Sequence, residues 1–181
     1  WIVSETELCK LEAMRKAVQA SRNARAIMAD VTDTELPICW RDPDYGVAKG
    51  RIDACGPDLL VEYKTCRDIS KRRFQYSASD LGYHLGIAWY WHGYARPKRV
   101  FFIAQQSSAP FKVAVYAVQT EALERYYEAA RAIAVQYRAA EQSGEFLDPY
   151  DVIQDFELPV GCDGDSDETD ISTGEADMVT L

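Results

Sequence analysis

Three charged residues lie close together in the stretch GRIDACGPDLLVEYKT, which runs from Gly50 to Thr65. Asp53 is followed nine residues later by Glu62, and Lys64 comes two residues after that. Two carboxylates a few ångströms apart repel each other and resist burial, and a divalent cation removes that conflict. Mg²⁺ prefers hard oxygen ligands, and a neighbouring lysine can orient or deprotonate a metal-bound water molecule or stabilise charge on a phosphate. The spacing therefore predicts hydrolysis of a phosphodiester with the help of a metal ion.

Two predicted strands must position these residues. Side chains alternate faces along a strand, so Glu62 and Lys64 share one face of the strand 59–66. In the strand 47–55 the face that carries Asp53 also carries Arg51 and Cys55, opposite Ile52 and Ala54. A tight turn at Gly56-Pro57-Asp58 makes the two strands neighbours, so we expect the three charges to converge. The alternative is a structural ion pair at the end of a strand.

The remaining pattern predicts an α/β (α+β) fold with a central mixed β-sheet flanked by helices. Ser4 and Glu7 form a possible capping box at the start of a helix that runs to about Ala29, and Ser70 precedes a long helix to about Tyr94. The predicted elements, in order, are helix 4–29, strands 35–41, 47–55 and 59–66, helix 70–94, strands 98–106 and 111–118, and helix 119–142.

The spacing D-(x)8-E-x-K between two strands resembles the PD-(D/E)XK nuclease motif. The longer segment CWRDPDYGVAKGRIDACGPDLLVEYKT resembles phage and prophage recombination exonucleases of the exodeoxyribonuclease VIII type, with matching positions at Glu35, Gly50-Arg51-Ile52-Asp53 and Glu62-Tyr63-Lys64-Thr65. The helical segment YHLGIAWYWHGY is similar to a Tyr-x-x-Gln-x-x-x-Tyr helix of that family, and FELPV near Glu157 is similar to the end of its domains. The resemblance covers roughly residues 30–160.

This resemblance implies a restriction-endonuclease-like core and a Mg²⁺-dependent DNA exonuclease, with Mn²⁺ as a possible substitute. Asp53, Glu62 and Lys64 would be catalytic, and the metal ligands would be Asp53, Glu62 and the backbone carbonyl of Tyr63. The enzyme would degrade linear duplex DNA from 5′ ends, supply a single-strand annealing protein and assemble into a homo-oligomer. The implied domain covers residues 1–160, and an acidic tail over 161–181 is expected to be disordered.

The sequence departs from the family pattern in two places. Gly86 stands where family members usually carry Gln, and the family's metal-ligating His lies upstream of the Asp, whereas His84 and His92 lie downstream. Because the chain begins at Trp1 without a Met, we expect that the missing His either is absent or belongs to a preceding segment. These departures leave open a second interpretation, a nonenzymatic nucleic-acid-binding module that retains the nuclease fold.

A basic segment follows the predicted catalytic strand. Lys64 to Arg73 holds five basic residues and one acidic residue, and it opens the predicted helix, where phosphate is favoured. We assign DNA contacts to Arg51, Thr65, Lys71, Arg72 and Arg73; a solvated basic turn is the alternative. Glu35 and Tyr83 are possible accessory residues; the alternatives are a strand-edge charge for Glu35 and an aromatic core stripe for Tyr83.

Composition sets further limits. The net charge of −9 comes from residues 148–181, which hold 11 acidic and no basic residues, so the rest of the chain is close to +2 and a basic DNA-binding surface remains compatible. No apolar run is long enough for a membrane helix, and the five cysteines contain no CxxC, which favours reduced thiols in a cytoplasmic protein. A nuclease with an iron–sulfur cluster shares the motif but would need four clustered cysteines.

Overall fold

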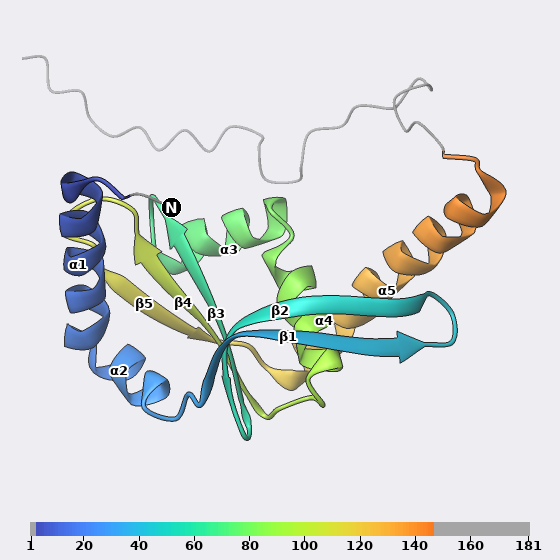
Figure 1. The fold of residues 1–181 in the computed structure, drawn as a ribbon, viewed down its shortest axis with the longest axis horizontal. Coiled ribbons are helices and arrows are strands. Elements are labelled where there is room, and N and C mark those ends of the chain that lie inside the picture. The colour runs from blue at the N-terminus through green and yellow to red at the C-terminus, as the bar shows by residue number, and fades with distance from the viewer. Residues whose placement is uncertain (1–2, 147–181) are drawn as a thin grey trace, which may run out of the picture. The chain divides into compact units, whose positions relative to one another are not determined.

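A five-stranded sheet forms the centre of the computed structural model, which describes residues 3–146 (Figure 1). The strands lie in sequence order, and all pairs are antiparallel except the third and fourth, which are parallel. Their bounds are β1 (Asp33–Asp42), β2 (Gly46–Gly56), β3 (Leu59–Cys66), β4 (Arg99–Gln106) and β5 (Val113–Ala117). This arrangement confirms the predicted mixed sheet with flanking helices.

The helices are α1 (Glu5–Ala20), α2 (Arg22–Met28), α3 (Lys71–Asp80), α4 (Tyr83–Gly93) and α5 (Thr120–Ser143). The predicted capping box is confirmed, because Ser4 and Glu7 exchange both of its hydrogen bonds. Two predicted long helices are each broken once. Ser21 ends α1 and caps α2 by accepting a hydrogen bond from the Ala24 amide, and Gly82 separates α3 from α4 with a φ of 67°, a left-handed conformation that glycine adopts without a steric penalty.

The break at Gly82 matters because α3 and α4 together make the crossover between β3 and β4. Parallel strands cannot be joined by a tight turn and need such a crossover. The two helices cover one face of the sheet with α5, and α1 and α2 cover the other. One core cluster joins Ile52, Leu60 and Phe102 to the α3–α5 side, and a second joins Val61 and Ile103 to Ala24 and Ile27 on the α2 side.

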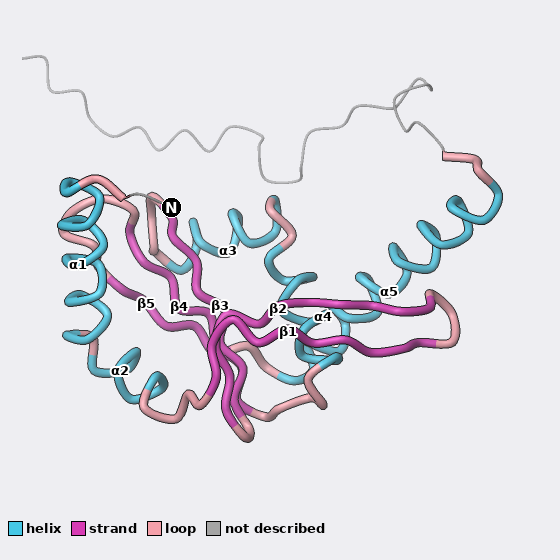
Figure 2. The backbone as a smooth tube through the Cα atoms, in the orientation of Figure 1, coloured by secondary structure: helices cyan, strands magenta, loops and turns pink. Residues whose placement is uncertain are grey.

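Strand β2 has two different partners along its length. It pairs with β1 almost throughout, but it pairs with β3 only over Ala54–Gly56. Beyond that point β2 leaves β3, and Figure 2 shows the β1–β2 hairpin running away from β3, β4 and β5. The strict alternation predicted for this strand is wrong at the point of departure, because Ile52 and Cys55 belong to the same core cluster. Asp53 therefore lies where β2 changes direction.

Residues Trp1–Glu145 form one compact unit. The proposed domain end at residue 160, the FELPV segment and the acidic tail lie outside the described residues. Within residues 3–146, no helix is both long and apolar enough to cross a membrane.

Candidate active site

Asp53, Glu62 and Lys64 converge where β2 leaves β3. The Lys64 ammonium lies 2.6 Å from Glu62 Oε2 and 3.7 Å from Asp53 Oδ2. Asp53 also accepts a hydrogen bond of 2.9 Å from the backbone amide of Tyr63, which ties the end of β2 to the middle of β3 although the strands no longer pair there. The predicted convergence of the three charges is therefore present, with one lysine shared between two carboxylates.

Glu62 is the most buried charged residue of the described chain, with 3% of its surface exposed. Burial raises the pKa of Glu62 to about 7, although the hydrogen bond and the charge of Lys64 act in the opposite direction. Its Oε1 is fully buried and has no hydrogen-bond partner within residues 3–146. A buried carboxylate oxygen without a partner is costly, so this atom requires an explanation that the described chain does not provide.

Lys64 is held in its charged form. Burial lowers the pKa of Lys64, but the hydrogen bond that Lys64 donates to Glu62 and the charges of Glu62 and Asp53 outweigh it, so the net shift is upward. Tyr83, at the start of α4, lies with its ring 5.4 Å from the Lys64 ammonium, which is a cation–π contact. Tyr83 therefore reaches the candidate site and also packs against the core.

The backbone of Tyr63 is fixed from both sides of the sheet. Its amide donates to Asp53, and its phenol donates to the side chain of Gln105, which is completely buried. Gln105 in turn donates to the carbonyls of Met14 and Phe111 at 2.9 and 3.1 Å. Sequence reasoning missed Gln105; the available signal was a glutamine at an inward-facing position of the apolar strand RVFFIAQQ.

Tyr90 is a second residue that sequence reasoning did not place at the site. Burial and then the charge of Glu62 raise the pKa of Tyr90, so its phenol stays protonated beside the carboxylates. Its ring lies directly against Gly50 of β2, where a Cβ atom would come within 2.6 Å of the ring. The signal was the helical spacing of seven residues from Tyr83 to Tyr90, which puts both tyrosines on one face of α4.

Among the described residues, the remaining predicted residues form no side-chain hydrogen bond or ion pair with Asp53, Glu62 or Lys64. Glu35 has a φ of 52° and forms an exposed ion pair of 2.9 Å with Arg51, and no ion pair with Lys64 is found for it among the described residues. Thr65 follows Lys64 directly in β3. Lys71, Arg72 and Arg73 are the first three residues of α3. The Cβ position of Gly86 has no atom within 4 Å, so the space for the family's Gln side chain is open.

The two histidines and the α4 tryptophans Trp89 and Trp91 contact other parts of the chain. His84 and His92 bind Ala78 and Tyr127 respectively, and neither lies with the carboxylates. Trp91 is a core residue, and Trp89 packs against Trp40 of β1 at a ring distance of 5.1 Å. No group of three or more His, Cys, Asp or Glu residues in the described segment is arranged to hold a metal ion.

The two carboxylates nevertheless fit a hard cation. The unpartnered Oε1 of Glu62 is a free buried acceptor, and Asp53 Oδ1 is not used in its bond to Tyr63. A divalent cation would remove the burial cost of Glu62 and leave Lys64 paired to the opposite oxygen. Asp53, Glu62 and the Tyr63 carbonyl are the groups that could hold it.

Comparisons with known proteins identify the family of this chain and a similar fold. Residues 4–146 match the family described as a PDDEXK-like domain of unknown function (DUF3799). The fold is similar to a "Putative exonuclease" from Eubacterium rectale, with a TM-score of 0.60 and 12% identity, covering 86% of this chain. This chain spans only 65% of the length of that protein. A weaker similarity, to a protein called SSO0001, has a TM-score of 0.40 and 15% identity and covers 71% of this chain and 58% of that one. No curated protein matches the sequence.

Proposed function

Because residues 4–146 place this chain in the PDDEXK-like DUF3799 family, we propose that the domain is a metal-dependent deoxyribonuclease. The observation that carries the proposal is the convergence of Asp53, Glu62 and Lys64, with one buried Glu62 oxygen left without a partner. A stabilising ion pair needs neither a second carboxylate beside the lysine nor an unused buried oxygen. A site that binds a cation and a phosphate needs both.

Each residue has a distinct role in this proposal. Asp53, Glu62 and the Tyr63 carbonyl would hold Mg²⁺, which when bound polarises the scissile phosphate and activates water as a nucleophile. Lys64, charged and fixed by Glu62, would stabilise the negative charge that develops on the phosphate. Tyr83 and Gln105 keep Lys64 and the Tyr63 backbone in place, and protonated Tyr90 can donate a hydrogen bond to a phosphate oxygen.

The substrate in this proposal is linear duplex DNA, degraded as an exonuclease from 5′ ends. The support is the resemblance to exodeoxyribonuclease VIII-type enzymes over the Arg51–Thr65 region and the fold shared with the Eubacterium rectale protein. Lys71, Arg72 and Arg73 would contact the backbone phosphates, together with Arg51 and Thr65. A single-strand annealing partner and a homo-oligomer belong to the same proposal.

The test is cleavage of end-labelled linear duplex DNA with Mg²⁺ or with EDTA. We expect Mg²⁺-dependent release of nucleotides by the wild type and a loss of rate on the order of 10³-fold for Lys64→Ala. Lys49→Ala is the matched control, since Lys49 is an exposed lysine of the hairpin. Equal cleavage by the wild type and Lys64→Ala would overturn the assignment.

One observation favours a second candidate function, a DNA-binding module without activity. The vacant space at Gly86, where the related nucleases carry Gln, removes a side chain that could contact the substrate. DNA binding without Mg²⁺-dependent cleavage in the same assay would identify this case.

A further inference from the structure

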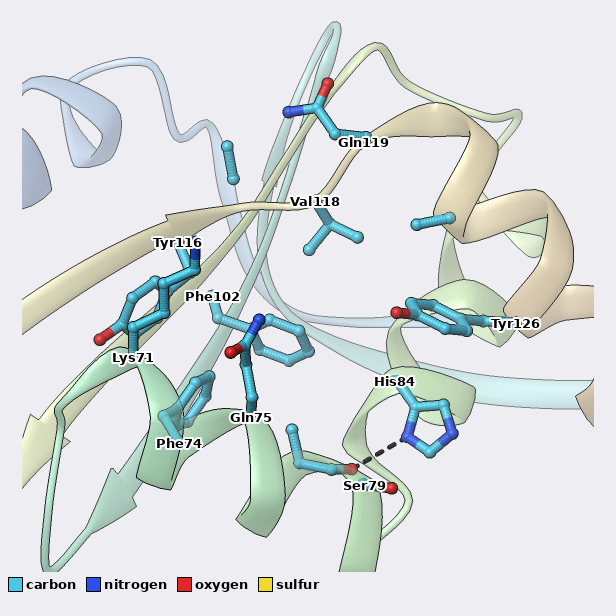
Figure 3. Close-up of a pocket in the computed structure, with 13 residues that line it drawn as sticks. Lys71, Phe74, Gln75, Ser79, His84, Phe102, Tyr116, Val118, Gln119 and Tyr126 are labelled. Atoms are coloured by element: carbon cyan, nitrogen blue, oxygen red, sulfur yellow. Dashed lines mark hydrogen bonds between the residues drawn. The ribbon is translucent and has the colours of Figure 1, made fainter. Parts of the chain in front are cut away.

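Apart from the candidate active site, a hollow lies on the same face of the sheet. It has a volume of about 420 Å³ and lies between α3, α4, the end of β5 and the start of α5 (Figure 3). Small-molecule sites usually fall between about 300 and 1,000 Å³. The hollow therefore has the size of a binding site, and of the residues assigned above to catalysis or to DNA contact only Lys71 lines it.

Aromatic rings form the floor of the hollow. Phe74 stacks on Tyr116 with ring centres 5.1 Å apart and planes 14° apart, and it meets Phe102 edge-on at 5.6 Å. At the other end Tyr126 meets His84 edge-on at 5.0 Å. Such a floor accepts a flat aromatic ligand, because rings pack in stacked or edge-to-face arrangements.

Polar groups around the rim are available to a ligand. The amides of Gln75 and Gln119 line the hollow and make no side-chain hydrogen bond to any residue within 3–146. The Nδ1 of His84 lies 2.9 Å from the Ala78 carbonyl, and since a carbonyl only accepts, Nδ1 carries the proton. In the neutral ring Nε2 is then an acceptor. Two amides and a ring nitrogen offer the donors and acceptors that the edge of a nucleobase requires.

A cation also lies at the rim. Lys71 lines the hollow and has no ion pair with another described residue. A flat ligand with polar edges and a negative group would contact the aromatic floor, the polar rim and Lys71 at the same time. We propose that this hollow, lined by Phe74, Gln75, His84, Phe102, Gln119 and Tyr126, binds a nucleobase that carries a phosphate.

The register of the sheet connects this hollow with the candidate active site. Phe102 is the direct partner of Glu62 across β3 and β4, and Tyr116 is the direct partner of Phe102 across β4 and β5. Neighbouring strands lie about 4.8 Å apart, so the aromatic floor begins one strand from the proposed metal ligand. The source of the base rests on the proposed function: it is either a mononucleotide released by cleavage or a nucleotide of the DNA strand.

The experiment measures binding without catalysis. In EDTA, calorimetric titration of the wild type with dAMP or dTMP should give saturable binding, and ribose 5-phosphate, which lacks the base, should give none. Gln75→Ala should weaken binding about fivefold, as expected for one lost hydrogen bond. Gln19→Ala is the matched control, since Gln19 is an exposed glutamine in the last turn of α1.

Amide NMR spectra locate the site independently of the mutants. The side-chain amide signals of Gln75 and Gln119 should shift with dTMP, and that of Gln19 should not. Titration with a single-stranded tetranucleotide of thymidine separates the two sources: tighter binding than dTMP identifies a DNA-strand nucleotide, and weaker binding identifies the released mononucleotide.

Absence of binding by all nucleotides, equal binding of ribose 5-phosphate, or equal effects of Gln75→Ala and Gln19→Ala would overturn the inference. Because no metal ion is present, these results do not depend on cleavage. A protein that binds dTMP but cleaves no DNA would refute the proposed nuclease and leave this pocket in place.

Discussion

Strands β2 and β3 behave differently at their two ends. At the paired end, Ala54–Gly56 and Leu59–Val61 share ladder hydrogen bonds and bury apolar side chains. At the open end, Asp53 faces Glu62 and Lys64 across a gap that the ladder no longer bridges. Glu62 is nearly as buried as Val61 beside it, at 3% against 1% exposed, yet one of its oxygens has no partner.

This difference shows how one strand pair can serve both stability and chemistry. The backbone groups at the paired end bond to each other without a ligand, so this end contributes to folding. The open end holds two carboxylates and one lysine, and burial there disfavours the charged form of Glu62. The comparison predicts that substitutions at the paired end change stability and that substitutions at the open end change function.

Leu60→Ala should have the largest effect on stability. Leu60 is completely buried at the paired end, and removal of a buried leucine side chain costs about 3 kcal/mol of unfolding free energy. Urea denaturation measures this loss. Nuclease activity per folded molecule should remain close to that of the wild type, and a large selective loss of activity would show that the two ends are not separate.

Glu62→Gln should change the pH dependence of stability in the protein without metal. The raised pKa of Glu62, about 7, means that the folded protein keeps a proton that the unfolded chain releases near pH 4.5. Its stabilising contribution is therefore complete below about pH 4.5 and is lost as the pH rises through about 7.

In EDTA we expect the wild type to lose on the order of 2 kcal/mol between pH 5 and pH 8, since one unit of pKa difference is worth about 1.4 kcal/mol. Glu62→Gln has no carboxyl to titrate and should lose much less. Denaturation curves at the two pH values measure both proteins. A wild type that is equally stable at both would contradict the burial cost at the open end.

The smallest effect on stability is expected for two exposed arginines, Arg51 in the β1–β2 hairpin and Arg99 in β4. Arg51 and Arg99 each form an exposed ion pair, with Glu35 and Asp30 respectively, and exposed pairs contribute about 0–1 kcal/mol. Arg51→Gln and Arg99→Gln should therefore change stability equally little. Only Arg51→Gln should reduce the salt dependence of DNA affinity. The slope of log affinity against log salt concentration should become smaller by about one. Equal salt slopes for both variants would remove Arg51 from the DNA interface.

Much of this fold was predictable because its signals are local. Alternation and turn residues predicted all five strands near their observed bounds, and the spacing from Asp53 to Lys64 predicted their convergence. The break at Gly82 was missed, and one continuous helix was predicted across it. The left-handed conformation at Gly82 is a feature of the folded backbone, which the spacing of apolar residues does not record.

The details of the site were less accessible for the same reason. At the departure of β2 from β3, Ile52 belongs to the same core cluster as Leu60 and Ile87, which lie in other elements. Gln105 reaches Tyr63 across the parallel pair of β3 and β4, and Tyr90 reaches β2 through Gly50. The sequence contains these residues, but only the tertiary structure brings them to the site.

Calorimetric titration with Mn²⁺ tests the central claim most directly, because it asks whether the open end binds a cation at all. The wild type should bind Mn²⁺ saturably, and Asp53→Asn, which keeps the size of the side chain but removes its charge, should lose that binding. Identical titrations of the wild type and Asp53→Asn, or no binding by the wild type, would contradict a metal site between β2 and β3.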